Sequence, residues 1–159
     1  MRYLFYVCLL VFNTNYLLAQ EIQSQSRIDE IVVTAEFNNI DAYSISSSIS
    51  VIGENDISKR NANHLEDLLF IAPNVNYSSG ASRGKFYQIR GIGERSEFTE
   101  PVNYSVGVII DGIDFTGIAL GASTFDVKQV EVLRGPQGTL YGANALAGLI
   151  NIVSNDPTE

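Results

Sequence analysis

Hydrophobic residues in this chain occur in short runs separated by polar and glycine-rich stretches. Alternating or continuous apolar residues, rich in Val and Ile, are typical of β-strands buried on one or both faces. Several runs are followed by glycine, and Asp111-Gly112 is a strong signal for a hairpin turn. Strands are therefore predicted at 46–52, 86–89, 104–110, 129–133 and 148–153.

Helical periodicity is clearest at 63–72. Asn63 is a suitable N-cap, Glu66 lies three residues later as in a capping box, and Pro73 ends the helix. A shorter helical turn is predicted at 56–60, and long loops at 76–85, 93–103 and 115–124. The predicted class is α+β, with a small mixed β-sheet, short helices and long loops. The apolar side of the main helix, which we expect to pack in the core, consists of Leu65, Leu68, Leu69 and Ala72.

The N-terminal part has a different character. Arg2 precedes an apolar run from Tyr3 to Phe12, and this run is too short for a transmembrane helix, which needs about 20 apolar residues. Residues 1–19 are predicted to be a secretory signal peptide, cleaved after Ala19. Residues 20–45 are predicted to be a flexible leader.

Composition narrows the possible functions. The chain has 10 Lys and Arg against 18 Asp and Glu, a net charge of -8, so a nucleic-acid partner is not predicted. It has one Cys and one His, which excludes a disulfide framework and a Cys-based zinc cluster. The glycine-rich stretches lack the Gly-Lys-Ser/Thr ending of a phosphate loop. We expect no metal, no cofactor and no enzymatic activity.

A candidate strand lies within the leader, and two interpretations of it remain open. Residues 36–44 are polar and turn-prone, so no hairpin partner is predicted nearby. The segment could be an edge strand of the domain, which the composition favours, or a strand that pairs with another protein by β-augmentation. It consists of Asp29, Glu30, Ile31, Val32, Val33, Thr34 and Ala35.

Arg90 and Arg134 form a second candidate site. Each ends a predicted strand and is followed by glycine, so its guanidinium group is expected at a fixed place on the domain edge. Arginine suits bidentate pairing with carboxylates. The partner could be a carboxylate outside the domain, or an internal one such as Glu131, and the sequence leaves both possibilities open.

A longer pattern resembles a known family. The stretches Val130–Gly142 (VEVLRGPQGTLYG) and Ala147–Val153 (AGLINIV) are similar to the plug domain of TonB-dependent outer-membrane receptors. Further segments resemble the family in the same order, over essentially residues 29–157. These are the TonB box at 29–35, the early plug helix at 65–73, the strand-Arg-Gly element at 88–91 and the central hairpin at 108–112.

The resemblance implies a specific function. The plug would lie inside a 22-stranded barrel in the outer membrane of a Gram-negative bacterium, and TonB would pair with the box in the periplasm. The substrate would be a large scarce solute such as a ferric siderophore. Arg90 and Arg134, with Glu131, would lock the plug to the barrel. Apex loops near the substrate would contain Tyr77, Ser78, Ser79, Arg95, Phe98 and Phe115.

The resemblance also implies a domain division. Residues 46–157 would form the plug, and 158–159 would begin a barrel that this chain does not contain. A 22-stranded barrel with strands of about 9–11 residues needs more than about 200 residues. We therefore expect a fragment of a receptor. The alternative is a free-standing periplasmic module that binds or signals without transport.

Overall fold

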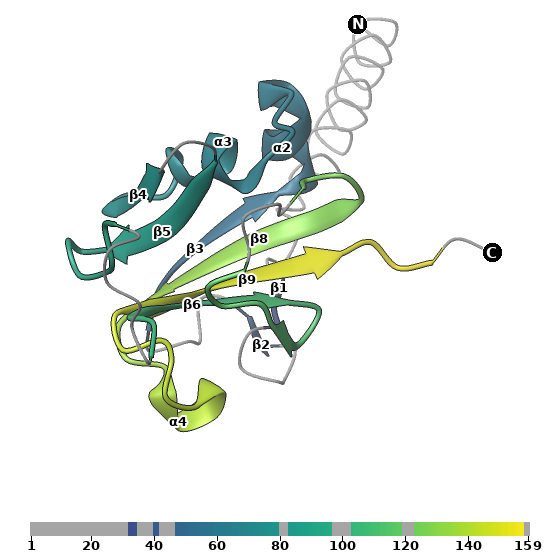
Figure 1. The fold of residues 1–159 in the computed structure, drawn as a ribbon. Coiled ribbons are helices and arrows are strands. Elements are labelled where there is room, and N and C mark those ends of the chain that lie inside the picture. The colour runs from purple at the N-terminus through teal and green to yellow at the C-terminus, as the bar shows by residue number, and fades with distance from the viewer. Residues whose placement is uncertain are drawn as a thin grey trace, which may run out of the picture. The chain divides into compact units, whose positions relative to one another are not determined.

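The computed structural model describes residues 32–34, 40–41, 47–79, 83–96, 103–118 and 123–157 (Figure 1). The chain divides into two compact units, 1–30 and 31–159, and all described residues belong to the second. The predicted signal peptide lies outside the described residues. So do five predicted site residues, namely Asp29, Glu30, Ile31, Ala35 and Phe98.

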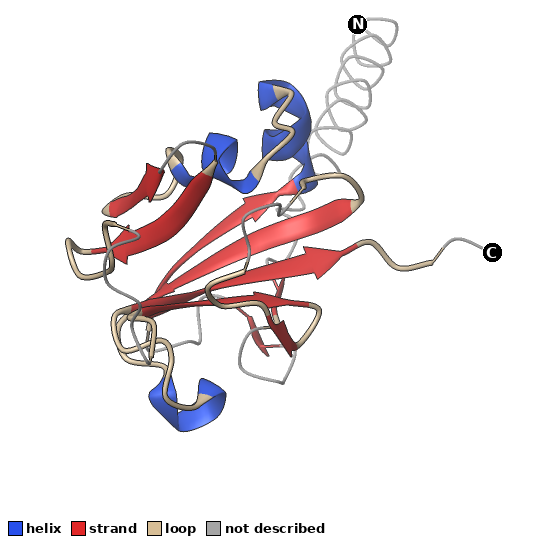
Figure 2. Ribbon diagram, in the orientation of Figure 1, coloured by secondary structure: helices blue, strands red, loops and turns tan. Residues whose placement is uncertain are grey.

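A five-stranded mixed sheet forms the centre of the unit (Figure 2), which confirms the predicted class. Strands β6 and β9 are parallel, and the other neighbouring pairs are antiparallel. The spatial order is β3 (Ser48–Gly53), β8 (Val127–Arg134), β9 (Gly148–Ser154), β6 (Val106–Ile110) and β7 (Ile113–Asp114).

Alternation along the two central strands gives this sheet two distinct faces. Val130 and Val132 of β8 point to one face, whereas Glu131 and Leu133 point to the other. Strands β8 and β9 are buried at most positions on both faces, as expected of strands covered on both sides. This burial explains why the sequence GLINIV is largely apolar.

One face is covered by helix α2 (Glu54–Arg60), helix α3 (Leu65–Leu69) and a hairpin of strands β4 (Val75–Ser79) and β5 (Gly84–Ile89) (Figure 1). We call it the helix-covered face. The predicted apolar side of α3 is buried as expected, since Leu65, Leu68, Leu69 and Ala72 are each at most 3% exposed.

The start of α3 differs from the prediction by one residue. His64, not Asn63, is the N-cap, and the N–H of His64 donates to Asp67 Oδ2 at 3.2 Å. Asp67 therefore holds the position that was predicted for Glu66. Glu66 instead accepts a hydrogen bond from the N–H of Gly84 at 3.2 Å, and so connects α3 to β5.

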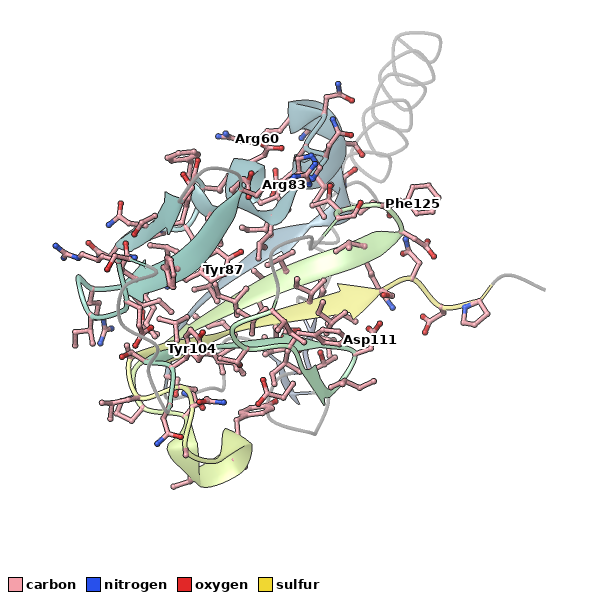
Figure 3. All side chains as sticks on the ribbon, in the orientation of Figure 1. Arg60, Arg83, Tyr87, Tyr104, Asp111 and Phe125 are labelled. Carbon is pink, nitrogen blue, oxygen red and sulfur yellow. The ribbon has the colours of Figure 1, made fainter. Side chains whose placement is uncertain are left out.

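The β4–β5 hairpin overturns one loop prediction. Residues 76–79 were predicted to be a loop, but they lie in β4 and pair with β5, with Tyr77 opposite Tyr87. Tyr87 is buried, and its hydroxyl donates to the carbonyl of Gly84 at 3.2 Å. Burial raises the pKa of Tyr87 to about 12, and the negative charge of Glu66 acts in the same direction. Figure 3 shows Tyr87 on β5.

The predicted hairpin turn at Asp111-Gly112 is confirmed. Both residues have positive φ, 48° and 82°, as a two-residue hairpin turn between β6 and β7 requires. The Asp111 carboxylate also accepts hydrogen bonds from Ser154 N–H at 2.9 Å and Ser154 hydroxyl at 2.7 Å. The turn is thereby attached to the end of β9. Figure 3 labels Asp111 at this position.

Candidate functional site

The candidate strand in the leader has a partner within the chain. Strand β1 (Val32–Val33) pairs antiparallel with β2 (Ile40–Asp41), Val32 opposite Asp41 and Val33 opposite Ile40. The prediction that no hairpin partner lies nearby was therefore wrong. Ile40 is a β-branched residue within a polar stretch. A strand of only two residues does not require a longer apolar run.

Val32–Thr34, which we call the docked segment, packs on the sheet face opposite the helices. We call this second face the segment-covered face. The Val33 side chain is 0% exposed and belongs to a small apolar cluster. The other buried members of that cluster are Ile109, Leu133, Ala145 and Leu149.

A buried polar group lies beside this apolar contact. Glu131 is 0% exposed, and its Oε1 accepts hydrogen bonds from Thr34 N–H at 2.8 Å and from Thr34 hydroxyl at 3.1 Å. Gln129 Nε2 donates to Glu131 Oε1 at 2.6 Å and to the Val32 carbonyl at 3.0 Å. Asn151 Nδ2 donates to Glu131 Oε2 at 3.1 Å and to Thr34 Oγ1 at 3.3 Å. The docked segment is thus held by side chains of β8 and β9.

These contacts correct the prediction for Glu131. It was predicted to help lock the plug to a barrel, but its carboxylate is fully buried and bonded to Thr34 of the same chain. Gln129 and Asn151 were not predicted as site residues. One signal was present, since Glu131 and Asn151 are polar residues within apolar runs and face each other as cross-strand partners.

The two arginines are attached to consecutive carbonyl groups. Arg134 Nε donates to the Pro73 carbonyl at 2.9 Å, and the backbone N–H of Arg90 donates to the Asn74 carbonyl at 2.8 Å. Arg134 Nη2 also donates to Ser50 Oγ at 2.7 Å. Burial lowers the pKa of the Arg134 guanidinium, and the nearby positive charge of Arg90 lowers it further. Two cations therefore lie close together.

The internal ion pair between Arg134 and Glu131 is not formed. The two residues are three positions apart on β8, so their side chains point to opposite faces of the sheet. Within the described part of the chain, the only ion pair is Lys128 with Asp156 at 2.9 Å. Arg90 is exposed at a tight turn with φ of 55°, and Arg134 is only 5% exposed.

The predicted apex residues are found in different settings. Tyr77, Ser78 and Ser79 belong to β4, and Ser78 Oγ accepts a hydrogen bond from Gln88 Nε2 at 2.8 Å. Arg95 is exposed, as a loop residue in contact with a solute would be. Phe115 is partly buried and packs against the main core, contrary to a role at an exposed apex. Contact of the remaining residues with a solute stays a prediction.

Other polar groups have ordinary structural roles. Burial by itself raises the pKa of the Asp114 carboxyl, but hydrogen bonds from Thr116 and Asn144 outweigh it and the net pKa is lowered. Among the described residues, no group of three or more His, Cys, Asp or Glu could hold a metal ion. None of the helices in the described ranges is long and apolar enough to cross a membrane.

The fold is that of the plug found in TonB-dependent receptors. Residues 41–149 match the family described as "TonB-dependent Receptor Plug Domain", and the chain belongs to this family. A curated relative, the vitamin B12 transporter BtuB of Vibrio vulnificus, is 32% identical over 145 residues, or 87% of this chain and 22% of the relative. The pesticin receptor of Yersinia pestis is 32% identical over 136 residues, covering 84% of this chain and 20% of that protein.

A solved structure gives the same result. The ferric yersiniabactin uptake receptor FyuA of Yersinia pestis matches with a TM-score of 0.61 and 30% identity, over 71% of this chain and 18% of that receptor. The chain spans about a fifth of the length of these relatives. Their names describe transport and reception, in agreement with the prediction that the chain is not an enzyme.

Proposed function

We propose that this chain is the plug of a TonB-dependent receptor in the outer membrane of a Gram-negative bacterium, with residues 29–35 as its TonB box. The observation that carries the proposal is the docked segment, a short strand at the N-terminal end of a plug fold. An extended segment of this kind suits β-augmentation, in which a partner adds a strand through main-chain hydrogen bonds. Residues 1–19 would direct export, and 46–157 would form the plug.

The proposed coupling relies on bonds of moderate strength. Each backbone hydrogen bond of an added strand contributes about 0.5–1.5 kcal/mol net. Several such bonds hold TonB firmly enough to transmit force, yet let it dissociate afterwards. The force would then remodel the plug and open a path for the solute.

We further propose that Arg90 and Arg134 bind carboxylates of a surrounding barrel. Two adjacent guanidinium groups repel each other, and no described carboxylate forms an ion pair with either of them. Carboxylates supplied from outside the plug would relieve this repulsion. Arginine is suited to this task because its planar group pairs with carboxylates in a bidentate geometry.

The proposed substrate is a large scarce solute such as a ferric siderophore. The name of FyuA specifies ferric yersiniabactin, which supports this class, while the name of BtuB specifies vitamin B12. Of the predicted contact residues, the structure leaves Ser79 and Arg95 exposed. Uptake of a radiolabelled ferric siderophore and of cobalamin by cells expressing the full-length receptor would distinguish these two classes.

The TonB-box assignment is tested by Val32→Pro. Proline removes the backbone N–H that a strand ladder uses, so binding of the periplasmic domain of TonB should be lost in isothermal titration calorimetry. In the full-length receptor, uptake should fail while solute binding remains. Ser24→Pro, in the polar leader, is the matched control and should bind TonB normally. Equal TonB affinity for wild type and Val32→Pro would refute the assignment and favour a free-standing module.

The role of the arginines is tested by changing Arg90 and Arg134 together to Ala. In the full-length receptor this should loosen the plug and raise passive leak of a large antibiotic through the outer membrane. Changing Lys59 and Arg60 to Ala removes the same charge from the exposed end of α2 and serves as the control. Leak that stays at the control level would argue against contacts with a barrel.

A further inference from the structure

We propose that Ser50 is a positioning residue for Arg134, and that it turns one edge of the guanidinium group toward a carboxylate from outside the plug. Ser50 and the Pro73 carbonyl hold another edge of the same group. The inference rests on the proposed function for the source of that carboxylate, a surrounding barrel. The orientation of Arg134 itself is a property of this chain alone.

The stereochemistry of arginine defines the free edge. A guanidinium group is planar and carries its N–H donors in a fixed fork. Nε and Nη2 border one edge, where Nε donates to the Pro73 carbonyl at 2.9 Å and Nη2 donates to Ser50 Oγ at 2.7 Å. Nη1 has no acceptor among the described residues. The edge between Nη1 and Nη2 is therefore the one that a carboxylate can approach in a bidentate geometry.

Both internal acceptors orient the cation without compensating its charge. A serine hydroxyl and a backbone carbonyl are neutral, so the positive charge of Arg134 stays available for an outside anion. Arg134 is only 5% exposed, and a buried charge without a counter-ion is unfavourable. A carboxylate at position 50 would instead form an internal ion pair and remove the need for an outside partner. The hydroxyl of Ser50 therefore suits a side chain that orients Arg134 for a partner elsewhere.

Ser50 reaches Arg134 because of its place in the sheet. Strand β3 pairs with β8 in a register that places Ser50 opposite Val132, so Arg134 is the diagonal neighbour of Ser50 on the helix-covered face. Long side chains can span this diagonal separation. Ser48 lies directly opposite Arg134 on the same face, but it is exposed and makes no described bond to the guanidinium group. Ser48 therefore offers a matched control on the same strand.

The backbone segment that holds Arg134 also holds the second arginine. The N–H of Arg90 donates to the Asn74 carbonyl at 2.8 Å, next to the Pro73 carbonyl that accepts from Arg134. Arg90 is exposed, so its side chain has several ways to meet an outside group, whereas Arg134 is buried. The orientation set by Ser50 consequently matters more for Arg134 than any comparable contact would for Arg90.

Rotation of the Arg134 guanidinium group about its Nε–Cζ bond, measured by NMR on the full exported chain, tests the orientation. In Ser50→Ala the rotation rate should rise by about tenfold, because a hydrogen bond from a charged group is lost. Ser48→Ala makes the same change two positions away and should leave the rate unchanged. Ser50→Thr keeps a hydroxyl and should keep the slow rate. A wild-type rate in folded Ser50→Ala would overturn the positioning role.

Passive leak of a large antibiotic through the full-length receptor tests the contact with a barrel. Ser50→Ala should raise leak toward the level of the variant in which Arg90 and Arg134 are both changed to Ala, while Ser48→Ala stays at the wild-type level. Ser50→Asp should also raise leak, because its internal ion pair with Arg134 competes with the barrel carboxylate. In Ser50→Asp the guanidinium rotation should nevertheless stay slow, whereas a merely loosened plug would rotate faster and leak more together.

The outcomes separate this inference from the proposed function. If the double arginine variant leaks while Ser50→Ala and Ser50→Asp do not, the positioning role is refuted and the barrel contact stands. If the double arginine variant does not leak, the barrel contact fails, and the rotation rate still decides whether Ser50 orients Arg134.

A second variant covers the case in which Ser50→Ala does not fold, which loss of Val132 amide protection in hydrogen exchange would reveal. Arg134→Lys keeps the positive charge, but a single ammonium group cannot hold both internal acceptors and also present a planar edge. It should therefore raise leak in the full-length receptor toward the level of the double arginine variant. Wild-type leak in a folded Arg134→Lys receptor would show that charge alone is sufficient and would overturn the inference.

Discussion

The two faces of the central sheet are covered in different ways. The helix-covered face carries a large apolar core, formed where α2, α3 and the β4–β5 hairpin pack on alternate residues of β8 and β9. The segment-covered face has a much smaller apolar cluster, in which Val33 is buried next to the polar side chains of Glu131 and Asn151. The same two strands therefore support both a core and a polar contact.

This difference distinguishes contacts that are permanent from contacts that can be broken and formed again. Apolar burial is non-directional and proportional to area, so a large apolar layer separates only when much surface is exposed to water. Directional hydrogen bonds can be exchanged one for one with a partner or with water at little net cost. The helix-covered face is thus suited to permanent structure, and the segment-covered face to reversible contact.

The largest expected effect is on the helix-covered face. Leu68→Ala removes a side chain that is 0% exposed and should reduce the free energy of unfolding by about 2–5 kcal/mol, measured by urea denaturation. Leu146→Ala makes the same change at a residue that is 66% exposed, and should stay within about 0.5 kcal/mol of wild type. Similar losses in both variants would mean that this face is not the main core.

A smaller and more local effect is expected on the other face. Val33→Ala should weaken docking by roughly 1–2 kcal/mol, because each buried CH₂ contributes about 0.8 kcal/mol. Thr34 amide protection should fall by about tenfold, while the urea midpoint of the sheet remains unchanged, since the segment opens before the core. A shift of the midpoint as large as that of Leu68→Ala would remove the distinction between the faces.

The effect that is smallest at neutral pH concerns Tyr87 on the helix-covered face, because it develops only at alkaline pH. The pKa of Tyr87 is raised to about 12 from the usual value of about 10, so the folded state favours the neutral phenol. This contribution is complete below about pH 10 and is lost as pH rises toward 12. Tyr87→Phe should show a weaker loss of stability over that range in denaturant titrations. An identical pH dependence in both proteins would show that Tyr87 does not contribute.

Sequence patterns predicted the helix-covered face better than the segment-covered face. The period of the apolar residues identifies Leu65, Leu68 and Leu69, because burial of a helix side leaves a regular signal. The boundary of α3 moved by one residue because Asp67, not Glu66, reaches the N-cap. Strand β4 was missed because VNYSS is largely polar, and its pairing with β5 is a tertiary effect.

The contacts of the docked segment were not predicted because the residues that form them are distant in sequence. Thr34 and Asn151 are 117 residues apart, and no local pattern connects them. The polar residues within the apolar strands β8 and β9 were the available signal, but Glu131 was assigned instead to a contact outside the plug. Phe125, labelled in Figure 3, is the opposite case. It is an apolar residue that the fold leaves outside the core, with 89% of its surface exposed.

Strand β8 carries Glu131 on one face and Arg134 on the other. The two residues are three positions apart, which is about 10 Å along a strand. Arg134 in turn is bonded to the Pro73 carbonyl, beside the Asn74 carbonyl that holds Arg90. A force on the N-terminal segment acts on β8 through Glu131, and a change at Arg90 and Arg134 acts on β8 through Arg134. Both therefore act on the same short stretch of backbone. A shift of one residue in the register of β8 would exchange its two faces. Glu131 and Arg134 would then both lie on the wrong side of the sheet.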